Sequence, residues 1–293
     1  MEVTAMQPEI TVGLDGSPES LSAARWAAHE AQLRGLPVRL LHLWITRPVT
    51  AQNIPAEYPQ AQAAQHILQD AESDLLKHCP HVPVITELLP ADSPAALLPA
   101  ARNAVLLGLG SQGLGPVQGY LLGSLALHAV ARFERPVVLV RACEEPDGTS
   151  TPAAQSGAVA IGLSLRSGYE GALGFAFGAA ARRGVPLLVV HATTRRPVAL
   201  RWERPPDESL QQADQRALHE ALLPWREKFP AVHVVEHLSH ESPARAVVDI
   251  APGAGLLVVG RGGYRTGLGP RIGPVAHAAI HHAACPVAVI PHD

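Results

Sequence analysis

The sequence contains two copies of one pattern, and this internal repeat constrains the fold more than any other feature. Four segments of the first half return in the same order in the second half: VRLLHLW (38–44) as PLLVVHA (186–192), DSPAALL (92–98) as ESPARAV (241–247), NAVLLGLGSQG (103–113) as GAGLLVVGRGG (253–263), and RPVVLV (135–140) as CPVAVI (285–290). The copies are about 150 residues apart, whereas the units of a solenoid are only about 20–50 residues long. The pattern therefore predicts two tandem copies of a whole domain.

The length of the chain agrees with two domains. Its 293 residues allow each copy to bury a core of its own, since single domains usually have about 100–200 residues. Between the copies, the segment EEPDGTSTPAAQS is rich in turn-forming residues and has no apolar periodicity. We therefore expect a first domain at 1–143, a linker at 144–156 and a second domain at 157–293.

The composition excludes several classes of protein. Hydrophobic residues make up 47% of the chain, which is too apolar for a disordered protein. The formal net charge of -3 gives no sign of a basic surface for nucleic acid or an anionic membrane. No apolar run reaches the roughly 18–20 residues that span a bilayer, the start of the chain does not resemble a signal peptide, and the cysteines lie far apart. These features predict a cytoplasmic protein with neither a nucleic-acid nor a membrane partner.

Short apolar runs alternate with helical segments in each half. In the first half we expect strands at 9–14, 38–43, 82–88, 104–109 and 136–141, and helices at 18–34, 60–78, 93–102 and 123–132. In the second half we expect strands at 158–163, 185–191, 232–238, 255–259 and 286–290, and helices at 168–183, 209–228, 243–251 and 273–283. The strands are apolar throughout rather than alternating, as in parallel sheets covered on both faces. We therefore predict an α/β fold of two tandem doubly wound domains, each with a five-stranded parallel sheet and helices on both faces.

Glycine-rich turns follow two strands of the first half. The first strand ends in Gly13-Leu14-Asp15-Gly16-Ser17, and the fourth leads into Gly110-x2-Gly113-x9-Gly123-Ser124. Glycines let a backbone approach phosphate oxygens closely, and the positive end of the helix that starts here favours an anion. A carboxylate such as Asp15 accepts hydrogen bonds from ribose hydroxyls. If the two turns are adjacent, they form a nucleotide site.

With this motif and the closing strand RPVVLV, the sequence resembles the universal stress protein family over nearly its whole length. The resemblance implies a strand order of 3-2-1-4-5 and, as in one branch of the family, ATP at the first copy, with Mg2+ as a possible companion. It also implies that Asp15 faces the ribose and that the backbone near Leu43 faces adenine. The residues that it assigns to the phosphates are Gly110, Gly113, Gly123 and Ser124. Gln112 departs from the Arg or His of many relatives, which removes a charged partner for phosphate.

The second half keeps the spacing of the motif but loses part of its chemistry. The matching positions, at which we expect a weaker second site, are Ser164, Gly260, Gly263 and Gly273. Pro274 stands where the first copy has Ser124, and proline lacks both the backbone N–H and the hydroxyl. Arg261, Arg265 and Arg271 either pair with phosphate in compensation or are solvated surface charges.

Other motifs support different chemistry less well. Gly108-x-Gly110-x2-Gly113 matches a dinucleotide fingerprint, but it follows the fourth strand instead of opening a domain. Neither a Walker sequence nor a Gly-x-Ser-x-Gly elbow occurs, so P-loop hydrolysis and a hydrolase triad are not indicated. The histidines of 277–282 and Cys285 are close in sequence but lack a zinc pattern, so we expect no metal site.

The sequence thus favours an ATP-binding regulator over an enzyme, and the resemblance implies a role in the stress response. The motif offers no general base, Walker lysine or arginine finger, so any ATP hydrolysis should be slow. One alternative is a weak ATPase. Another is an interaction module without a nucleotide, in which the strand-5 edges VVLV and VAVI pair within the chain or in a dimer.

Two further features concern the rim of the expected crevice. His42 and His191 end matching apolar strands, where packing at the core or rim is favoured over catalysis. The segments 46–60 and 193–209 follow the second strand of each copy, and they are either lids over adenine or variable connections.

Overall fold

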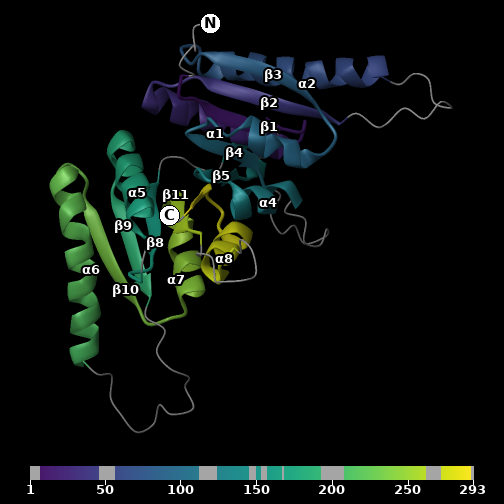
Figure 1. The fold of residues 1–293 in the computed structure, drawn as a ribbon. Coiled ribbons are helices and arrows are strands. Elements are labelled where there is room, and N and C mark those ends of the chain that lie inside the picture. Colours follow the sequence, from purple (N-terminus) through teal and green to yellow (C-terminus); the bar gives the residue numbers. More distant parts are fainter. Residues whose placement is uncertain are drawn as a thin grey trace, which may run out of the picture. The chain divides into compact units, whose positions relative to one another are not determined.

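The computed structural model describes residues 7–45, 57–111, 124–144, 150–152, 157–166, 168–192, 208–261 and 272–291. The chain forms two compact units, Met1–Ala153 and Ala154–Asp293. In each unit helices pack against a twisted sheet (Figure 1). The repeat in the sequence is therefore a repeat of structure.

The first unit is built on a five-stranded parallel sheet. Its elements are β1 (Ile10–Leu14), α1 (Pro18–Arg34), β2 (Val38–Ile45), α2 (Glu57–His78), β3 (Val84–Ala91), the short 3-10 helix η1 (Pro94–Ala96), α3 (Leu97–Ala100), β4 (Leu106–Gly110), α4 (Ser124–Arg132) and β5 (Val137–Val140). The strands lie in the order β3-β2-β1-β4-β5, and every neighbouring pair is parallel. The predicted α/β sheet is confirmed, together with the strand order that the resemblance implied.

The second unit repeats this architecture. Its elements are β8 (Ala158–Leu163), α5 (Glu170–Arg183), β9 (Leu187–Ala192), α6 (Glu208–Lys228), β10 (Val234–Ser239), α7 (Pro243–Ile250), η3 (Ala251–Gly253), β11 (Ala254–Gly260), α8 (Pro274–His282) and β12 (Val287–Ile290). The strand order is β10-β9-β8-β11-β12, again with parallel neighbours. Each strand therefore has a counterpart at the same place in the other unit's sheet.

Two segments differ from the sequence-based expectation. The helix expected at 93–102 is divided into η1 and the single turn of α3. Proline at position 99 explains the interruption, because it has no N–H and its ring crowds the carbonyl four residues earlier. The linker expected at 144–156 is partly ordered, since β7 (Ser150–Pro152) pairs antiparallel with β6 (Ala142–Glu144). Both short strands contact α1, so packing on the first unit orders a segment that has no periodicity of its own.

The strand order creates a switch point between β1 and β4. From β1 the chain proceeds to β2 and β3, and it then returns to β4 and β5 on the other side of β1. Because such crossovers are right-handed, α1 and α2 cover one face of the sheet, while α3 and α4 cover the other. The loops after β1 and β4 therefore diverge at the carboxyl edge, where α/β folds bind their ligands.

Local signals fix both ends of α1. Ser17 caps its N-terminus by accepting a hydrogen bond from the backbone N–H of Ser20 at 3.1 Å, and Pro18 occupies the first turn, where no N–H is needed. Gly35 ends the helix in the left-handed conformation with a φ of 65°, as Gly184 does after α5. The N-cap starts α1 three residues after β1, which fixes the short loop of residues 15–17.

The two units join their first two helices by different means. Arg25 of α1 donates two hydrogen bonds to the carboxylate of Asp74 in α2, each 2.7 Å long. In the second unit, Gly174 of α5 leaves room for Trp225 of α6, because a Cβ on this glycine would lie 2.9 Å from the indole ring. Trp225 also stacks with Phe177 at a centroid distance of 6.0 Å. An ion pair therefore links α1 to α2 in the first unit, whereas the packing of aromatic rings links α5 to α6 in the second.

The ion pair of Arg25 and Asp74 makes the contact between α1 and α2 sensitive to acid. Burial by itself would raise the pKa of Asp74, but the hydrogen bonds and charge of Arg25 bring that pKa below its ordinary value. Such a carboxylate stabilises the fold above its unfolded pKa of about 3.9, and the contribution is lost as the pH falls through the lower folded pKa. The stabilisation is therefore fully present at neutral pH.

We expect Asp74→Asn to lower the free energy of unfolding of the first unit by about 1–3 kcal/mol at pH 7, because Arg25 loses its charged partner. The difference from wild type should shrink below about pH 3.9, as Asp74 itself becomes neutral. Urea unfolding of the full chain between pH 7 and pH 3 measures both effects. The exposed Asp70 provides a control, and Asp70→Asn should change stability by less than about 0.5 kcal/mol. Equal losses for the two variants would contradict this role of the ion pair.

Candidate functional site

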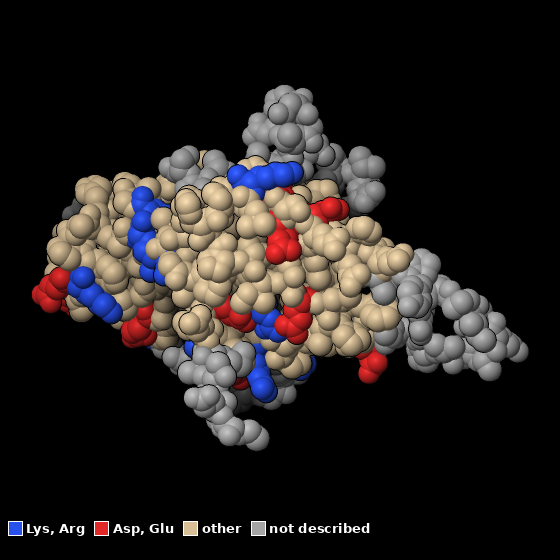
Figure 2. Space-filling model, turned by 90° about the horizontal axis from the view of Figure 1, so that it is seen from above, with Lys and Arg blue, Asp and Glu red and all other residues tan. Residues whose placement is uncertain are grey.

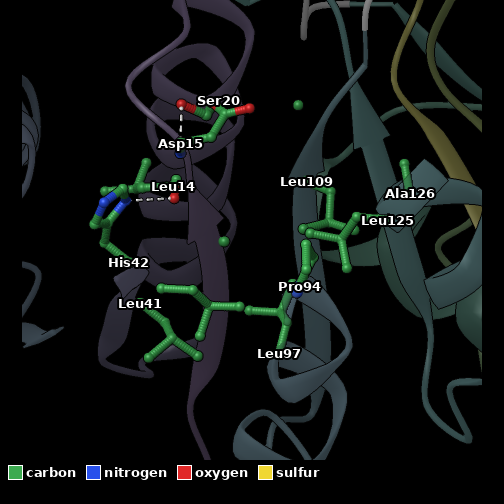
Figure 3. A pocket seen from close by; sticks show the side chains of 13 residues that line it. Leu14, Asp15, Ser20, Leu41, His42, Pro94, Leu97, Leu109, Leu125 and Ala126 are labelled. Carbon is green, nitrogen blue, oxygen red and sulfur yellow. Dashed lines mark hydrogen bonds between the residues drawn. The ribbon is translucent and has the colours of Figure 1, made fainter. Parts of the chain in front are cut away.

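A cleft of about 250 Å³ opens at the carboxyl edge of the first unit's sheet, at the switch point between β1 and β4. Its lining residues come from the ends of β1, β2 and β4 and from the starts of α1, η1, α3 and α4: Gly13, Leu14, Asp15, Ser20, Leu41, His42, Leu43, Pro94, Leu97, Leu109, Gly110, Leu125 and Ala126. Figure 3 shows Asp15 and Ser20 together at one end, with leucines on both sides of the cleft. The cleft thus has an apolar interior and one polar end.

The carboxylate of Asp15 is held in place by the residues that begin α1. Both the backbone N–H and the hydroxyl of Ser17 donate to its Oδ1, at 2.9 and 2.5 Å. The hydroxyl of Ser20 donates to the carbonyl of Ser17 at 2.9 Å and accepts from the backbone N–H of Asp15 at 3.4 Å. The capping residues of the helix therefore also orient the acidic residue of the cleft.

These hydrogen bonds keep Asp15 ionised. Its partial burial would by itself raise the pKa, but the hydrogen bonds from Ser17 and Ser20 hold the pKa below its ordinary value. A negative charge therefore stands at the polar end of the cleft at neutral pH. Since an ionised carboxylate only accepts hydrogen bonds, this end suits a ligand group that donates them, such as a sugar hydroxyl.

His42 and His191 make the same contact in the two units. The Nδ1 of His42 lies 2.8 Å from the carbonyl oxygen of Leu14, and the Nδ1 of His191 lies 2.9 Å from that of Leu163. Because a carbonyl oxygen only accepts, Nδ1 is the protonated nitrogen of each ring. The bond of His42 ties the ends of β1 and β2 together beside the cleft that it lines (Figure 3).

The structure brings together three of the residues predicted for the site. Asp15, Leu43 and Gly110 all line the cleft, because β1 pairs with β2 on one side and with β4 on the other. Ser124 is the first residue of α4, and the two residues after it also line the cleft. Two predicted glycines, Gly113 and Gly123, lie outside the described residues, and so does most of the two possible lids, 46–60 and 193–209.

Gly110 has a packing role that its motif did not reveal. A Cβ at this position would lie 2.6 Å from the backbone nitrogen of Ser20 and 2.7 Å from the carbonyl carbon of Glu19. The first turn of α1 therefore rests directly on the end of β4. Backbone atoms cannot move aside as the tip of a side chain can, so this approach requires glycine. The contact brings the loop of Asp15 to the end of β4.

The sequence did not single out the apolar walls of the cleft. Leu41, Leu97 and Leu109 are buried and come from β2, α3 and β4. In the sequence they have the pattern of ordinary core residues, so periodicity cannot distinguish them. Gly13 lets them converge, because a Cβ there would lie 2.8 Å from Cδ2 of Leu109 and 3.1 Å from Cδ2 of Leu97.

The second unit keeps the scaffold of this site with different chemistry. Three of the residues predicted for a weaker site are described, and they are the exposed Ser164 after β8, Gly260 at the end of β11 and Gly273 at the N-cap of α8. Gly263, Arg265 and Arg271 lie outside the described residues. Pro274 opens α8 and offers no N–H to an anion. Arg261, in the place that Ser111 has in the first unit, is buried with 7% of its surface exposed.

Comparison with known proteins settles the family. The model of the universal stress protein family matches residues 6–141 and again residues 159–291. The chain belongs to the universal stress protein family. Universal stress protein Rv2623 of Mycobacterium tuberculosis (strain ATCC 25618 / H37Rv) is 31% identical to it, covering 96% of this chain and 95% of its own length. Rv2005c of the same strain is 32% identical, covering 97% of each.

Solved structures agree on the fold of this family. The crystal structure of a universal stress protein from Archaeoglobus fulgidus DSM 4304 covers 97% of this chain and 98% of its own, with a TM-score of 0.71 and 15% identity. At that identity the likeness supports the fold alone. The resemblance of the motifs to this family is confirmed by the sequence matches.

Other kinds of site find less support in the described part of the chain. No group of three or more His, Cys, Asp and Glu side chains is placed there to hold a metal ion. The rings of His277 and His281 lie 4.2 Å apart, but they are only a pair. On the face drawn in Figure 2, positive and negative side chains are interspersed rather than gathered by sign. None of the described helices is both long and apolar enough to cross a membrane.

We expect Gly110→Ala to destabilise the first unit, because the added methyl group would meet the backbone of α1. Gly108→Ala is a matched control in the same strand, since its Cβ would have no neighbour closer than 3.5 Å. Overpacking a core usually costs about 1–3 kcal/mol, so thermal unfolding should show a loss of that size for Gly110→Ala alone. Similar stabilities for the two variants would mean that α1 does not rest on β4.

Proposed function

We propose that the first unit binds ATP or a similar adenine nucleotide in its cleft, and that the protein is a cytoplasmic, nucleotide-responsive regulator in the stress response. The observation that carries the proposal is the meeting of Asp15, the glycine end of β4 and apolar walls at one cleft. Membership of the family supports it, because the resemblance of the glycine motif to that family implies ATP at the first copy.

Each part of a nucleotide would find a matching surface. Adenine would lie against apolar side chains such as Leu43, and the ribose hydroxyls would donate to the carboxylate of Asp15. The phosphates would pass Gly110 toward the N-terminus of α4, whose positive end favours anions. The cleft of about 250 Å³ is below the about 300–1,000 Å³ of typical ligand sites. We therefore expect the nucleoside to fill it and the phosphates, with any Mg2+, to lie beyond it.

In this proposal the second unit binds a nucleotide more weakly. Ser164 supplies no charge for a ribose, and Pro274 removes a backbone donor from the first turn of α8. The buried Arg261 leaves the second unit with positive charge where the first has a hydroxyl. Fifth-strand pairing, either within the chain or between copies, is a separate proposal that needs no nucleotide.

Isothermal titration of ATP into the full chain should show one strong binding event per chain. Asp15→Asn should weaken binding by about ten- to hundred-fold, which is the usual effect of losing a hydrogen bond to a charged group. Ser164→Ala, at the equivalent place in the second unit, should leave the strong event unchanged. A folded wild-type protein that neither binds added ATP nor releases adenine on denaturation would refute the proposal and favour the interaction module.

Hydrolysis of ATP should be much slower than the about 1–100 turnovers per second of kinases. Asp15 is a poor general base, because its pKa is lowered and the hydroxyl of Ser17 already donates to it. Phosphate release measured with and without Mg2+ tests this expectation. Turnover in the range of dedicated ATPases would instead assign the protein to the enzymes.

A further inference from the structure

The polar end of the first unit's cleft is negatively charged, and no basic residue there balances it. Asp15 is the only acidic residue among the described residues that line the cleft, and neither lysine nor arginine is among them. The stretch 111–127, which leads from β4 into α4, contains no charged residue at all. The N-terminus of α4 contributes about half a positive charge, whereas Asp15 carries a full negative one. On charge alone, this end of the cleft therefore favours a cation.

The described polar side chains that line the cleft offer acceptors but no free donor. Both hydrogen bonds from Ser17 to Asp15 end on Oδ1, which leaves Oδ2 to accept from a ligand. The hydroxyl of Ser20 donates to the carbonyl of Ser17 and accepts from the backbone N–H of Asp15. The Nδ1–H of His42 is donated to the carbonyl of Leu14, so Nε2 of the neutral ring is an acceptor. A ligand that donates several hydrogen bonds complements this set.

The rest of the cleft is apolar. Its walls include Leu41, Leu97 and Leu109, which are all buried, and leucines lie on both sides of it (Figure 3). Its volume of about 250 Å³ is below the about 300–1,000 Å³ of sites for drug-sized ligands. Each methylene that a ligand buries in apolar surroundings raises its affinity about four-fold. A compact apolar body of a few carbon atoms therefore suits the space between the leucines.

We propose that this cleft binds small primary amines with an apolar body, in their protonated form. The ammonium group has a positive charge and three donors. It would donate to Oδ2 of Asp15 in a charge-assisted hydrogen bond, with Nε2 of His42 as a second acceptor. Such a ligand has neither a base nor a phosphate, which takes this role of the cleft beyond the proposed function. Because both ligands need Asp15, an amine and a nucleotide would exclude each other.

The second unit lacks the charge that this ligand requires. Ser164 follows β8 where Asp15 follows β1, so the carboxylate is replaced by a neutral hydroxyl. Arg261, which follows β11, is buried and brings a positive charge to the same edge of the sheet. Like charges repel, so this edge disfavours an ammonium group. We therefore expect one amine to bind per chain, in the first unit.

The experiment compares ligands of one length that differ in their head group. Hexylamine, hexanol and hexanoate are titrated into the full chain at pH 7, where an alkylamine is protonated, and ligand-observed NMR gives the affinities. We expect hexylamine to bind at least about ten-fold more tightly than hexanol, because it forms a hydrogen bond between charged groups. Hexanoate should bind more weakly than hexanol, because its charge has the same sign as that of Asp15.

Two further comparisons locate the head and the body of the amine. Asp15→Asn removes the charge but keeps the size of the side chain, and it should weaken hexylamine by about ten- to hundred-fold while changing hexanol by less than about two-fold. Asp70→Asn, which removes an exposed carboxylate of α2, should bind both ligands like wild type. In wild type, each methylene added between butylamine and hexylamine should raise the affinity about four-fold, because it is buried between leucines.

Equal affinities of wild type for hexylamine and hexanol would overturn the proposal without any variant, since the charge of Asp15 would then not select the ligand. An affinity that does not rise with chain length would overturn it too, because the amine would lie outside the apolar cleft. Titration of ATP into the same wild-type protein separates this proposal from the proposed function. Binding of ATP without binding of hexylamine refutes only the amine site, and binding of hexylamine without binding of ATP refutes only the nucleotide site.

Discussion

The direct contact between the first turn of α1 and the end of β4 is the constraint on which the first unit's site depends. It is a contact of backbone with backbone, and it exists because Gly110 has no side chain. Through it the loop of Asp15, in which Ser17 also caps α1, meets the segment that leads into α4. A larger residue at this point would separate α1 from β4 and the carboxylate from the cleft at once.

The two units show which parts of this fold tolerate change. Both keep the strand order, the glycine that ends their first helix and the bond from a histidine Nδ1 to the end of the first strand. They differ in side chains that the backbone geometry does not require. An ion pair of Arg25 and Asp74 links the first two helices of the first unit, and Trp225 links those of the second. The scaffold therefore depends on backbone geometry, while the chemistry at the carboxyl edge is free to diverge between copies.

The electrostatics of the cleft suit binding better than proton transfer. A general base works best when its pKa is near the working pH, yet the hydrogen bonds around Asp15 lower its pKa. The Nδ1–H of His42 is committed to the carbonyl of Leu14. Asp15 is thus a fixed hydrogen-bond acceptor for a ligand, and the bond of His42 fixes the orientation of its ring beside the cleft.

Local sequence patterns determined most of the secondary structure of this protein. The apolar runs, the caps at Ser17 and Gly35 and the repeat fixed the order of elements and most of their bounds, because these signals act between near neighbours in the chain. The glycine motif and Asp15 also pointed to the end of the sheet at which the cleft opens. The tertiary structure alone decided that Leu41, Leu97 and Leu109 form the walls of one cleft. It also showed that Gly110 must be a glycine, because the backbone of α1 lies where a Cβ would be. The packing of β7 against α1 and the unpaired hydroxyl of Ser111 likewise appear only in the structure. These features arise between residues far apart in sequence, whose meeting depends on strand order and on packing that no local pattern records.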